Sequence, residues 1–354
     1  MPQLAWPSRP LRSPGSGGGD PVIPVPLPVL EVLAQAFGVH CADLVKFAGG
    51  GSENDGVIYA YRAPGSRRLL KVMAIPEDAR QGGLFCLDER LKFMRFLGEH
   101  GASIAFPLLS PQGAIYETVA YADHVWIGYT MDLAPGHEVP PDTWDSCLFQ
   151  RWGQAIGKLH RLAQEYPSWQ SSVEPETGTE LLTWREEWEG FHNWCPDDQV
   201  KLEWERVKER LEELPAPRDA FGFIHNDPHI WNLRYDGERV TLLDFDVANH
   251  HWFATDISIA CQSLLFAQTG GMGSPLRDRA KLVEFLSCFR AGYQLENMLA
   301  DEWWDRLDLF IAYRRILLFI VMHGWIGSDP GRLDAWQQMI LEHPQLLGPW
   351  TRQG

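Results

Sequence analysis

The stretch that decides the fold is residues 225–232, which read HNDPHIWN, together with residues 244–246, which read DFD. Four residues separate Asp227 from Asn232, and Asp244 follows twelve residues after Asn232, at the end of an apolar run. Phosphoryl transfer uses such a set, because one carboxylate orients the attacking hydroxyl while a second carboxylate and an amide oxygen hold Mg²⁺ on the nucleotide phosphates. A two-stranded hairpin between the two segments would return Asp244 to the side of Asn232.

Upstream lie the residues that would bind a nucleotide. Gly49, Gly50 and Gly51 stand between two strand-like runs, and glycine lets a backbone approach phosphates closely. Lys71 lies in the apolar run LLKVM, and Glu89, on the next predicted helix, is its candidate partner. Each feature alone has an ordinary explanation, a turn for the glycines and a snorkelling edge residue for the lysine. The order of glycine loop, lysine, helix carboxylate and acidic loop is that of a kinase.

These motifs resemble the aminoglycoside phosphotransferase and choline-kinase-like family of protein-kinase-fold enzymes, which includes homoserine, hydroxylysine and stress-response kinases. The family's loop typically reads His-Gly-Asp-x-His-x-x-Asn, and here Asn226 replaces the commoner glycine. The resemblance covers roughly residues 45–265. Its further matching elements are Pro135-Gly136, Leu159-His160, Asp244-Phe245-Asp246 and Asp256-Ile257-Ser258.

The resemblance implies a role for each matched residue. Asp227 would be the catalytic base, Asn232 and Asp244 the Mg²⁺ ligands, and Lys71 the lysine that contacts the phosphates of ATP. It also implies an α+β, two-lobed protein-kinase-like fold, with a small antiparallel-sheet N-lobe that carries one main helix and a larger, mostly helical C-lobe. The residues expected to line the adenine are Met131, Asp132 and Leu133.

Composition and periodicity divide the chain into three parts. Residues 1–28 are rich in Pro, Gly and Ser and are predicted to be a disordered tail. Residues 29–133 are expected to form the nucleotide-binding lobe, and residues 134–354 the catalytic and acceptor-binding lobe. The predicted elements are helices at 29–37 and 87–98, strands at 44–47, 57–63, 69–74, 114–119, 126–133, 221–225 and 240–247, and helical stretches at 152–163, 181–191 and 279–325.

The charge of the chain excludes several classes of protein. With 31 Lys and Arg against 47 Asp and Glu, the formal net charge is −16, which argues against a nucleic-acid partner and against docking on an anionic membrane. No apolar run approaches the roughly 20 residues that span a bilayer, and the N-terminus lacks the apolar segment of a signal peptide. The six cysteines show no CxxC pair and are expected to be reduced thiols. A cytoplasmic location is therefore expected.

The segment 165–219 suggests the kind of acceptor. It holds 15 Asp and Glu against 6 Lys and Arg, and carboxylates with aromatic rings suit a cationic acceptor. An aminoglycoside, an amino alcohol or a hydroxy amino acid would fit. The alternative is that the aromatic residues are core, because part of them follows a helical stripe. The tryptophans concerned are Trp169, Trp184, Trp188, Trp194 and Trp204.

The sequence thus predicts an ATP-dependent phosphotransferase that moves the γ-phosphate to a hydroxyl of a small acceptor. Two alternatives keep the same fold: a protein Ser/Thr kinase, and a pseudokinase that binds nucleotide without catalysis. A third alternative is a metal hydrolase with His225, Asp227 and His229 as ligands and with His250 and His251 nearby, but it leaves the glycine loop and the lysine unexplained.

Other residues of the motifs have ordinary roles as their first interpretation. His160 and His225 are expected to be hydrogen-bonded core histidines rather than catalysts. Asp256 is expected to be structural, with its side chain capping the helix that follows, and Asp246 to cap a turn.

Overall fold

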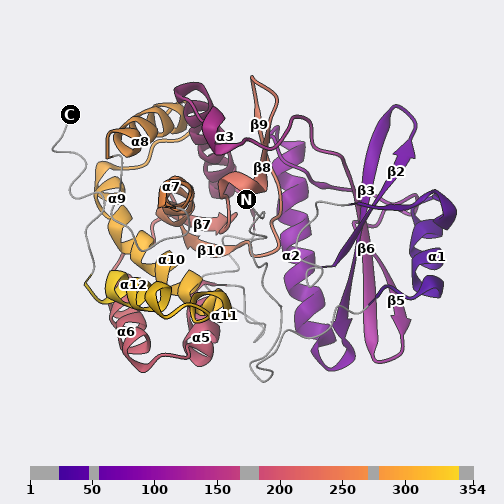
Figure 1. Ribbon diagram of the computed structural model, residues 1–354. Helices are drawn as coiled ribbons and strands as arrows, with labels where there is room; N and C mark the ends of the chain where they lie inside the picture. The colour runs from indigo at the N-terminus through magenta and orange to yellow at the C-terminus, as the bar shows by residue number, and fades with distance from the viewer. Residues whose placement is uncertain (1–23, 48–55, 168–182, 270–278, 343–354) are drawn as a thin grey trace. The chain divides into compact units, whose positions relative to one another are not determined.

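The computed structural model describes residues 24–47, 56–167, 183–269 and 279–342. The chain forms two compact units, which divide between Ala134 and Pro135 (Figure 1). Of the predicted disordered tail, residues 1–23 lie outside the described ranges, and the first helix begins at Leu27, two residues before its expected start. None of the helices in these ranges is both long and apolar enough to cross a bilayer.

Unit 1 is built on a six-stranded antiparallel sheet with the order β1-β2-β3-β6-β4, in which β5 also pairs with β6. The strand-rich pattern predicted for this region is confirmed. The hairpin between the second and third strands turns through Pro64 and Gly65, whose φ of 79° only glycine adopts at little cost. The strands are β1 (Val45–Lys46), β2 (Val57–Ala63), β3 (Ser66–Pro76), β4 (Pro107–Leu108), β5 (Glu117–Tyr121) and β6 (His124–Asp132).

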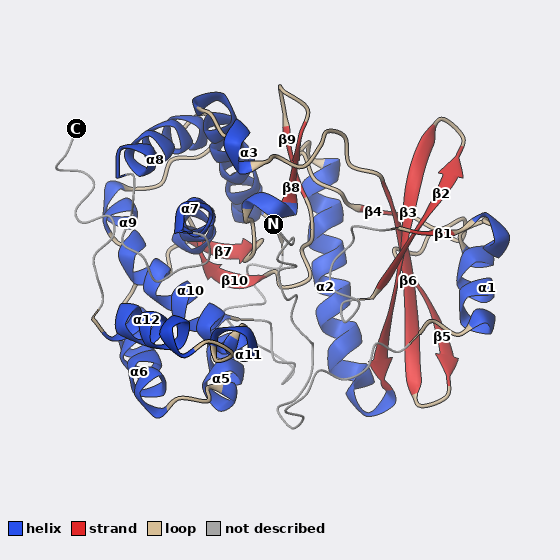
Figure 2. Ribbon diagram, viewed as in Figure 1, coloured by secondary structure: helices blue, strands red, loops and turns tan. Residues whose placement is uncertain are grey.

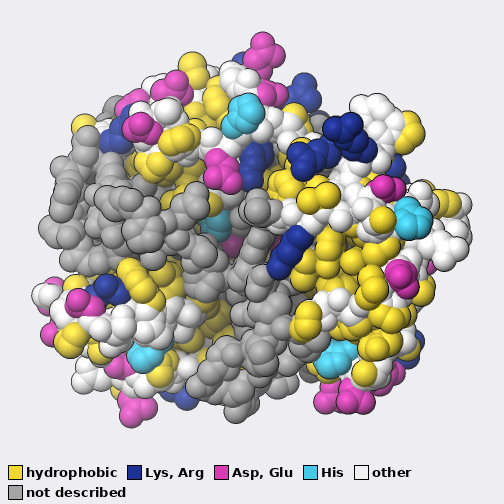
Figure 3. Space-filling model, turned by 45° about the vertical axis from the view of Figure 1, so that its right-hand side comes forward, with side chains coloured by type: hydrophobic (Ala, Val, Ile, Leu, Met, Phe, Trp, Pro, Cys, Tyr) yellow, Lys and Arg dark blue, Asp and Glu magenta, His cyan; other side chains and the backbone are white. Residues whose placement is uncertain are grey.

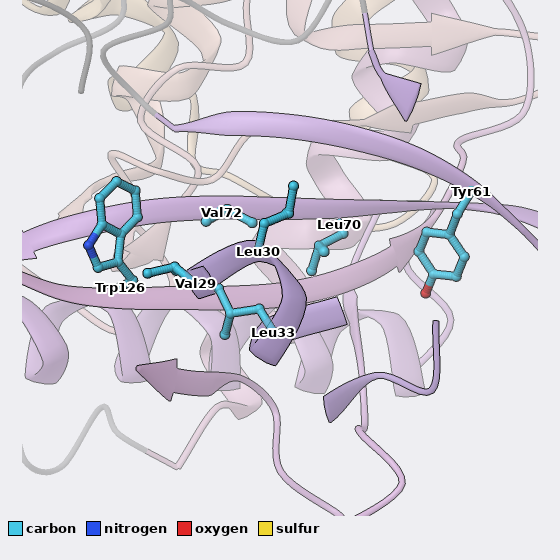
Figure 4. Close-up of a cluster of buried hydrophobic side chains, with 7 residues drawn as sticks. All are labelled: Val29, Leu30, Leu33, Tyr61, Leu70, Val72 and Trp126. Atoms are coloured by element: carbon cyan, nitrogen blue, oxygen red, sulfur yellow. The ribbon is translucent and has the colours of Figure 1, made fainter. Parts of the chain in front are cut away.

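One helix covers each face of this sheet (Figure 1). On one face lies α1 (Leu27–Ala36), whose apolar residues pack with the alternate side chains of β3 and with β6. This pattern follows from the period of two in a strand, which sends successive side chains to opposite faces. The cluster is drawn in Figure 4 and consists of Val29, Leu30, Leu33, Tyr61, Leu70, Val72 and Trp126.

The other face is covered by α2 (Arg80–Glu99), which is longer than the predicted helix at 87–98. Its early residues include Gly82 and Gly83, whose low helix propensity hides the start of the helix in the sequence. Gly83 is in close contact with the sheet, because a Cβ there would lie 2.9 Å from the side chain of Ile75. Lys71 is an even number of residues from Ile75 and therefore faces α2.

Unit 2 is mostly helical, with two short two-stranded sheets (Figure 2). The predicted helical stripe at Trp152, Ile156, Leu159 and Ala163 is confirmed, since all four side chains are buried. The helices are α3 (Ser146–Glu165), α5 (Trp184–Trp194), α6 (Asp198–Glu212), α7 (Phe253–Thr269), α8 (Arg279–Tyr293), α9 (Asp301–Asp305), α10 (Leu307–Val321), α11 (His323–Ile326) and α12 (Pro330–Leu341).

Close packing of α3 on α8 fixes the frame of unit 2. A Cβ on Gly153 of α3 would lie 1.9 Å from the carbonyl oxygen of Phe289, and a Cβ on Gly292 of α8 would lie 1.8 Å from that of Gln150. The two backbones therefore approach to a distance that only glycine permits. This approach sets the relative position of side chains that α3 and α8 contribute to the interior.

The short strands of unit 2 lie before, between and after the motif residues along the chain. The strand β7 (Phe221–Ile224) pairs with β10 (Asn249–Trp252), and Ile224 lies opposite Asn249. Residues 225–248 therefore begin and end at the same edge of this two-stranded sheet. Within that segment β8 (Leu233–Tyr235) pairs with β9 (Val240–Leu242) as the predicted hairpin. The second strand ends at Leu242 rather than at the predicted residue 247, and β10 was not predicted.

The chain has a formal net charge of −16. On the face drawn in Figure 3, acidic side chains lie at several separate places rather than in one patch.

Candidate active site

The loop that carries the central motif begins where β7 ends, and its backbone makes a sharp turn at Asn226. The φ of Asn226 is 64°, in the left-handed region that asparagine tolerates better than most residues with a side chain. This explains why asparagine can replace the glycine that is commoner in the resembling family. Its side chain also anchors the loop, because Nδ2 donates to the carbonyl oxygen of Val247 (3.1 Å) and to Glu187 Oε2 (2.5 Å).

Asp256 stabilises this turn through hydrogen bonds to its backbone. Its fully buried carboxylate accepts hydrogen bonds from the backbone N–H of His225 (3.1 Å) and of Asn226 (2.7 Å). A structural role for Asp256 is confirmed, but the expected cap of its own helix is wrong. The carboxylate instead satisfies two buried backbone donors that the turn leaves without partners in the sheet.

A chain of side chains orients Asp256 in turn. His160 Nε2 lies 3.1 Å from Asp256 Oδ2, its Nδ1 lies 2.9 Å from the hydroxyl of Tyr293, and Asn297 Nδ2 donates to that hydroxyl (2.9 Å). Burial lowers the pKa of His160, so the ring is neutral and its single proton points at the carboxylate. The interpretation of His160 as a hydrogen-bonded core histidine is confirmed.

His225 ties the loop to the DFD segment. Its Nδ1 accepts from the backbone N–H of Asp227 (3.3 Å), and its Nε2 donates to the carbonyl oxygen of Leu243 (2.8 Å). The ring also lies against Phe245, with 4.2 Å between centroids. Burial lowers the pKa of His225, which keeps it neutral and able to make both bonds. His225 is therefore a structural clamp, as expected.

Asp227 lies at the centre of the site and keeps part of its carboxylate exposed, at 17% for the side chain. Asn232 Nδ2 donates to the carbonyl oxygen of Asp227 (3.1 Å) and lies 3.4 Å from Oδ2. His229 Nε2 lies 3.5 Å from Oδ2, and Arg314 makes a close ion pair with Oδ1. The loop thus presents a carboxylate that is oriented from several sides.

The hairpin brings Asn232 and Asp244 together as the spacing predicts. Leu243, the residue after β9, donates its N–H to the carbonyl oxygen of Asn232 (2.9 Å), and Asp244 is the next residue along the chain. Asp244 has a φ of 64°, a strained conformation for a residue with a side chain. Nδ2 of Asn232 is bonded to Asp227. A carboxylate and an amide oxygen are ligands that a hard divalent cation prefers, so the residue types fit the predicted cation site, and their joint binding of a cation stays a prediction.

The predicted nucleotide residues lie in unit 1. Lys71 is buried on the face of the sheet that α2 covers, and Glu89, on α2, pairs with Lys92 Nζ at 3.5 Å. The Lys71–Glu89 pair itself stays a prediction. Gly49, Gly50 and Gly51 lie outside the described residues.

Three further predicted nucleotide residues lie at the end of β6 and directly after it. Met131 pairs with Leu69 in the sheet, and Leu133 donates its N–H to the carbonyl oxygen of Arg67 (2.9 Å). Asp132 Oδ1 accepts from Arg68 Nε (3.2 Å), so this carboxylate is turned toward its own sheet.

The buried tryptophans of α5 and α6 do not form an acceptor site. Trp184, Trp188 and Trp204 are at most 7% exposed, and the indole N–H groups of Trp188 and Trp204 each donate to the other's carbonyl oxygen (2.9 and 3.1 Å). Cationic side chains of the protein itself lie over two of the rings, with Arg185 on Trp184 and Lys208 on Trp188. The expectation that these rings bind a cationic acceptor is wrong, because they form the core. Trp169 lies outside the described residues.

The described residues do not form the metal site that the metal-hydrolase alternative requires. Across the described ranges, no three His, Cys, Asp or Glu side chains group around a common metal position. Both ring nitrogens of His225 are bonded within the protein, and Nδ1 of His251 accepts from the N–H of Trp252 (2.9 Å).

Sequence reasoning missed two residues of the site. Arg314 comes from α10, where Arg314 and Arg315 interrupt an apolar run, and that interruption was the available signal. Glu187 of α5 joins three segments, because its carboxylate accepts from Asn226, from Asn249 Nδ2 (2.9 Å) and from the hydroxyl of Tyr313 (3.0 Å). No local pattern marks Glu187 within its acidic segment.

Buried histidines make the stability of this unit sensitive to pH. Burial lowers the pKa of His229, His250 and His251 from 6.5 to about 4 each. Such a histidine binds a proton when the chain unfolds, so its stabilising effect is complete above pH 6.5 and is lost as the pH falls toward 4. We expect the free energy of unfolding, measured in urea, to fall between pH 7 and pH 5 by up to about 1.4 kcal/mol per pH unit for each histidine.

His250→Gln isolates one of these contributions, since burial is the sole cause of its shift and its ring packs edge-on against Phe223. The variant should show a shallower dependence of unfolding free energy on pH than the unmodified protein. His100→Gln, at an exposed position of unit 1, is the control for the change of residue type. Equal slopes for all three proteins would contradict the assignment.

Comparison with known proteins agrees with this geometry. The sequence matches the family described as the phosphotransferase enzyme family over residues 45–287. The amicoumacin kinase of Bacillus subtilis (strain 168) is 27% identical over 299 residues, which cover 83% of this chain and 84% of that protein.

Solved structures show the same fold. An amicoumacin kinase in complex with AMP-PNP, Ca²⁺ and Ami superposes with a TM-score of 0.74 at 24% identity, over 88% of this chain and 92% of that one. A microcompartment-associated aminopropanol kinase superposes with a TM-score of 0.64 at 18% identity, over 90% and 98%. The predicted kinase-like fold class is confirmed. Since the family match covers most of the sequence, the chain belongs to the phosphotransferase enzyme family, and its activity is that of a kinase.

Proposed function

We propose that this protein transfers the γ-phosphoryl group of ATP to a hydroxyl of a small-molecule acceptor. The observation that carries the proposal is the arrangement in unit 2 of Asp227, Asn232 and Asp244, which one loop and one hairpin bring to adjoining positions. The relatives support a small acceptor, because their names give them as kinases of amicoumacin and of aminopropanol. The relative bound to AMP-PNP and Ca²⁺ supports a nucleotide with a divalent cation.

In this mechanism Asp227 orients the acceptor hydroxyl and accepts its proton. The oxygen–phosphorus bond to the acceptor forms while the bond from the γ-phosphorus to ADP breaks, and the proton ends on the carboxylate. Most of the rate enhancement comes from holding the hydroxyl in line with the phosphoryl group.

Asn232 and Asp244 would hold Mg²⁺, which when bound neutralises charge on the phosphates. Unit 1 would hold the nucleotide, with Lys71 on its phosphates, Glu89 as the partner of that lysine, and the backbone of residues 131–133 beside the adenine. The glycines at 49–51 would cover the phosphates.

The test is a phosphoryl-transfer screen with γ-labelled ATP and Mg²⁺. One arm offers small hydroxyl compounds that include aminoglycosides, amicoumacin, aminopropanol, choline-like amines, homoserine and hydroxylysine. A second arm offers denatured and native cell protein, and a third offers water alone. We expect label in the small-molecule arm. Label that enters protein alone would favour the protein Ser/Thr kinase, and nucleotide binding without label transfer or ATP hydrolysis in any arm would favour the pseudokinase.

A further inference from the structure

Arg314 lies outside the motifs that define the site. It sits on α10, beyond the last residue of the family match at position 287, and 87 residues from Asp227 in the sequence. Its side chain is only 6% exposed, and its Nη2 contacts Asp227 Oδ1. We infer that Arg314 is a positioning residue for phosphoryl transfer, which holds one oxygen of Asp227 so that the other faces the acceptor hydroxyl. The inference rests on the role proposed for Asp227 as the base.

The placement of Arg314 in an apolar helix is costly without a partner. The residues before and after it, from Leu309 to Ile320, are all buried. A buried guanidinium is tolerated when an anion and hydrogen bonds compensate the loss of water. Among the described residues the anion that Arg314 contacts is Asp227, so the two side chains stabilise each other's burial.

The two oxygens of Asp227 are held unequally. Oδ1 is engaged by the guanidinium, whereas the contacts of Oδ2 with described residues are longer, at 3.4 Å to Asn232 Nδ2 and 3.5 Å to His229 Nε2. Hydrogen bonds of N–H to oxygen are strongest near 2.9 Å, so Oδ2 keeps most of its capacity as an acceptor. Oδ2 is therefore the oxygen available to a substrate hydroxyl.

A guanidinium suits this task better than other cations. Its Nη2 donor forms a directional, charge-assisted bond to Oδ1, which restrains the rotation of the carboxyl group more than a point charge such as an ammonium does. A base that must meet a hydroxyl in line with the phosphoryl group loses rate when its carboxyl group rotates away. Arg314 thus acts on kcat through Asp227 rather than on nucleotide binding.

Arg315 provides a matched control within the same helix. It is also buried, but its Nη1 donates to the carbonyl oxygen of Met339 (3.1 Å) in α12 rather than to Asp227. A change at Arg315 tests what the loss of a buried arginine does to folding without touching the site.

The experiment measures Mg²⁺-dependent ATP hydrolysis with water as acceptor, together with the Kd for ATP, in Arg314→Ala, Arg314→Lys and Arg315→Lys. We expect kcat to fall about 100-fold in Arg314→Ala with the Kd for ATP within about threefold. Arg314→Lys should recover only part of the rate. Guanidinium ion added at millimolar concentration should raise the rate of Arg314→Ala, because it can enter the space that the side chain leaves. The same addition should not change the rate of Arg315→Lys.

A double substitution separates this inference from the proposed function. If Arg314 acts through Asp227, Arg314→Lys should have less than a threefold effect on kcat in an Asp227→Asn background. Near-normal kcat in Arg314→Ala or Arg314→Lys, with Asp227→Asn inactive, would overturn the inference and leave the proposed function standing. Near-normal turnover in Asp227→Asn would contradict both the role of Asp227 as the base and the inference about Arg314. If Arg314→Ala does not fold, the Arg314→Lys rate and the double substitution decide.

Discussion

Asp227→Asn is expected to lower kcat by about 1,000-fold while the Kd for Mg²⁺–ATP stays within about threefold. The amide has the shape of the carboxylate but cannot accept the proton of the acceptor hydroxyl. It also leaves the buried Arg314 without its anion, so a lower unfolding temperature should accompany the loss of rate. Steady-state transfer from γ-labelled ATP measures kcat, and calorimetric titration with nucleotide shows whether the protein is folded and binds.

The control for Asp227→Asn is Asp236→Asn in the turn of the β8–β9 hairpin. Asp236 Oδ1 accepts from the backbone N–H of Glu238 (2.9 Å) and of Arg239 (2.7 Å), and an asparagine oxygen can accept the same bonds. This variant should retain at least half of the normal kcat. Turnover of Asp227→Asn within tenfold of normal would show that another group serves as the base.

Asp244→Asn is expected to abolish most of the Mg²⁺-dependent turnover, by about 100-fold or more at millimolar Mg²⁺. A hard divalent cation prefers a carboxylate, and an amide oxygen provides neither its charge nor its affinity. Asparagine is the fitting replacement because it tolerates the φ of 64° found at this position, so the backbone strain does not change with the charge.

The measurement for Asp244→Asn is a titration of turnover with Mg²⁺ and with Mn²⁺. The concentration of Mg²⁺ that gives half of the maximal rate should rise at least tenfold, while the Kd for ATP without metal stays as it was. Asp244→Ala should lose the same activity and in addition lower the unfolding free energy by about 1 kcal/mol, because alanine is less favourable at positive φ. An unchanged Mg²⁺ requirement in Asp244→Asn would rule out this residue as a ligand.

The local motifs were readable from the sequence because their geometry depends on short stretches of chain. The six residues from Asp227 to Asn232 form one loop. A hairpin of two three-residue strands brings Asp244 beside Asn232 without help from distant segments. The strand at 57–63 has the bounds that the sequence predicts, since alternation and the Pro-Gly turn define a hairpin locally.

The errors arise where packing overrides a local pattern. The start of α2 was placed late because Gly82 and Gly83 weaken the helical signal, although the contact of Gly83 with Ile75 requires a small residue there. Asp256 was expected to cap its own helix, but the buried N–H groups of the turn at residues 225–226 compete for its carboxylate. Trp188 of α5 and Trp204 of α6 pair with each other in the core rather than face a ligand.

By itself the sequence determined the family and the fold class, and spacing over a few residues predicts the three polar residues of the acidic loop and hairpin. Only the tertiary structure decided which distant side chains orient Asp227 and the turn beneath it. Arg314, Glu187 and the pair of His160 with Asp256 reach the loop from four helices, and no regular spacing links them. Their meeting depends on how those helices pack, as at the glycine contacts between α3 and α8, where a single Cβ would force the backbones apart.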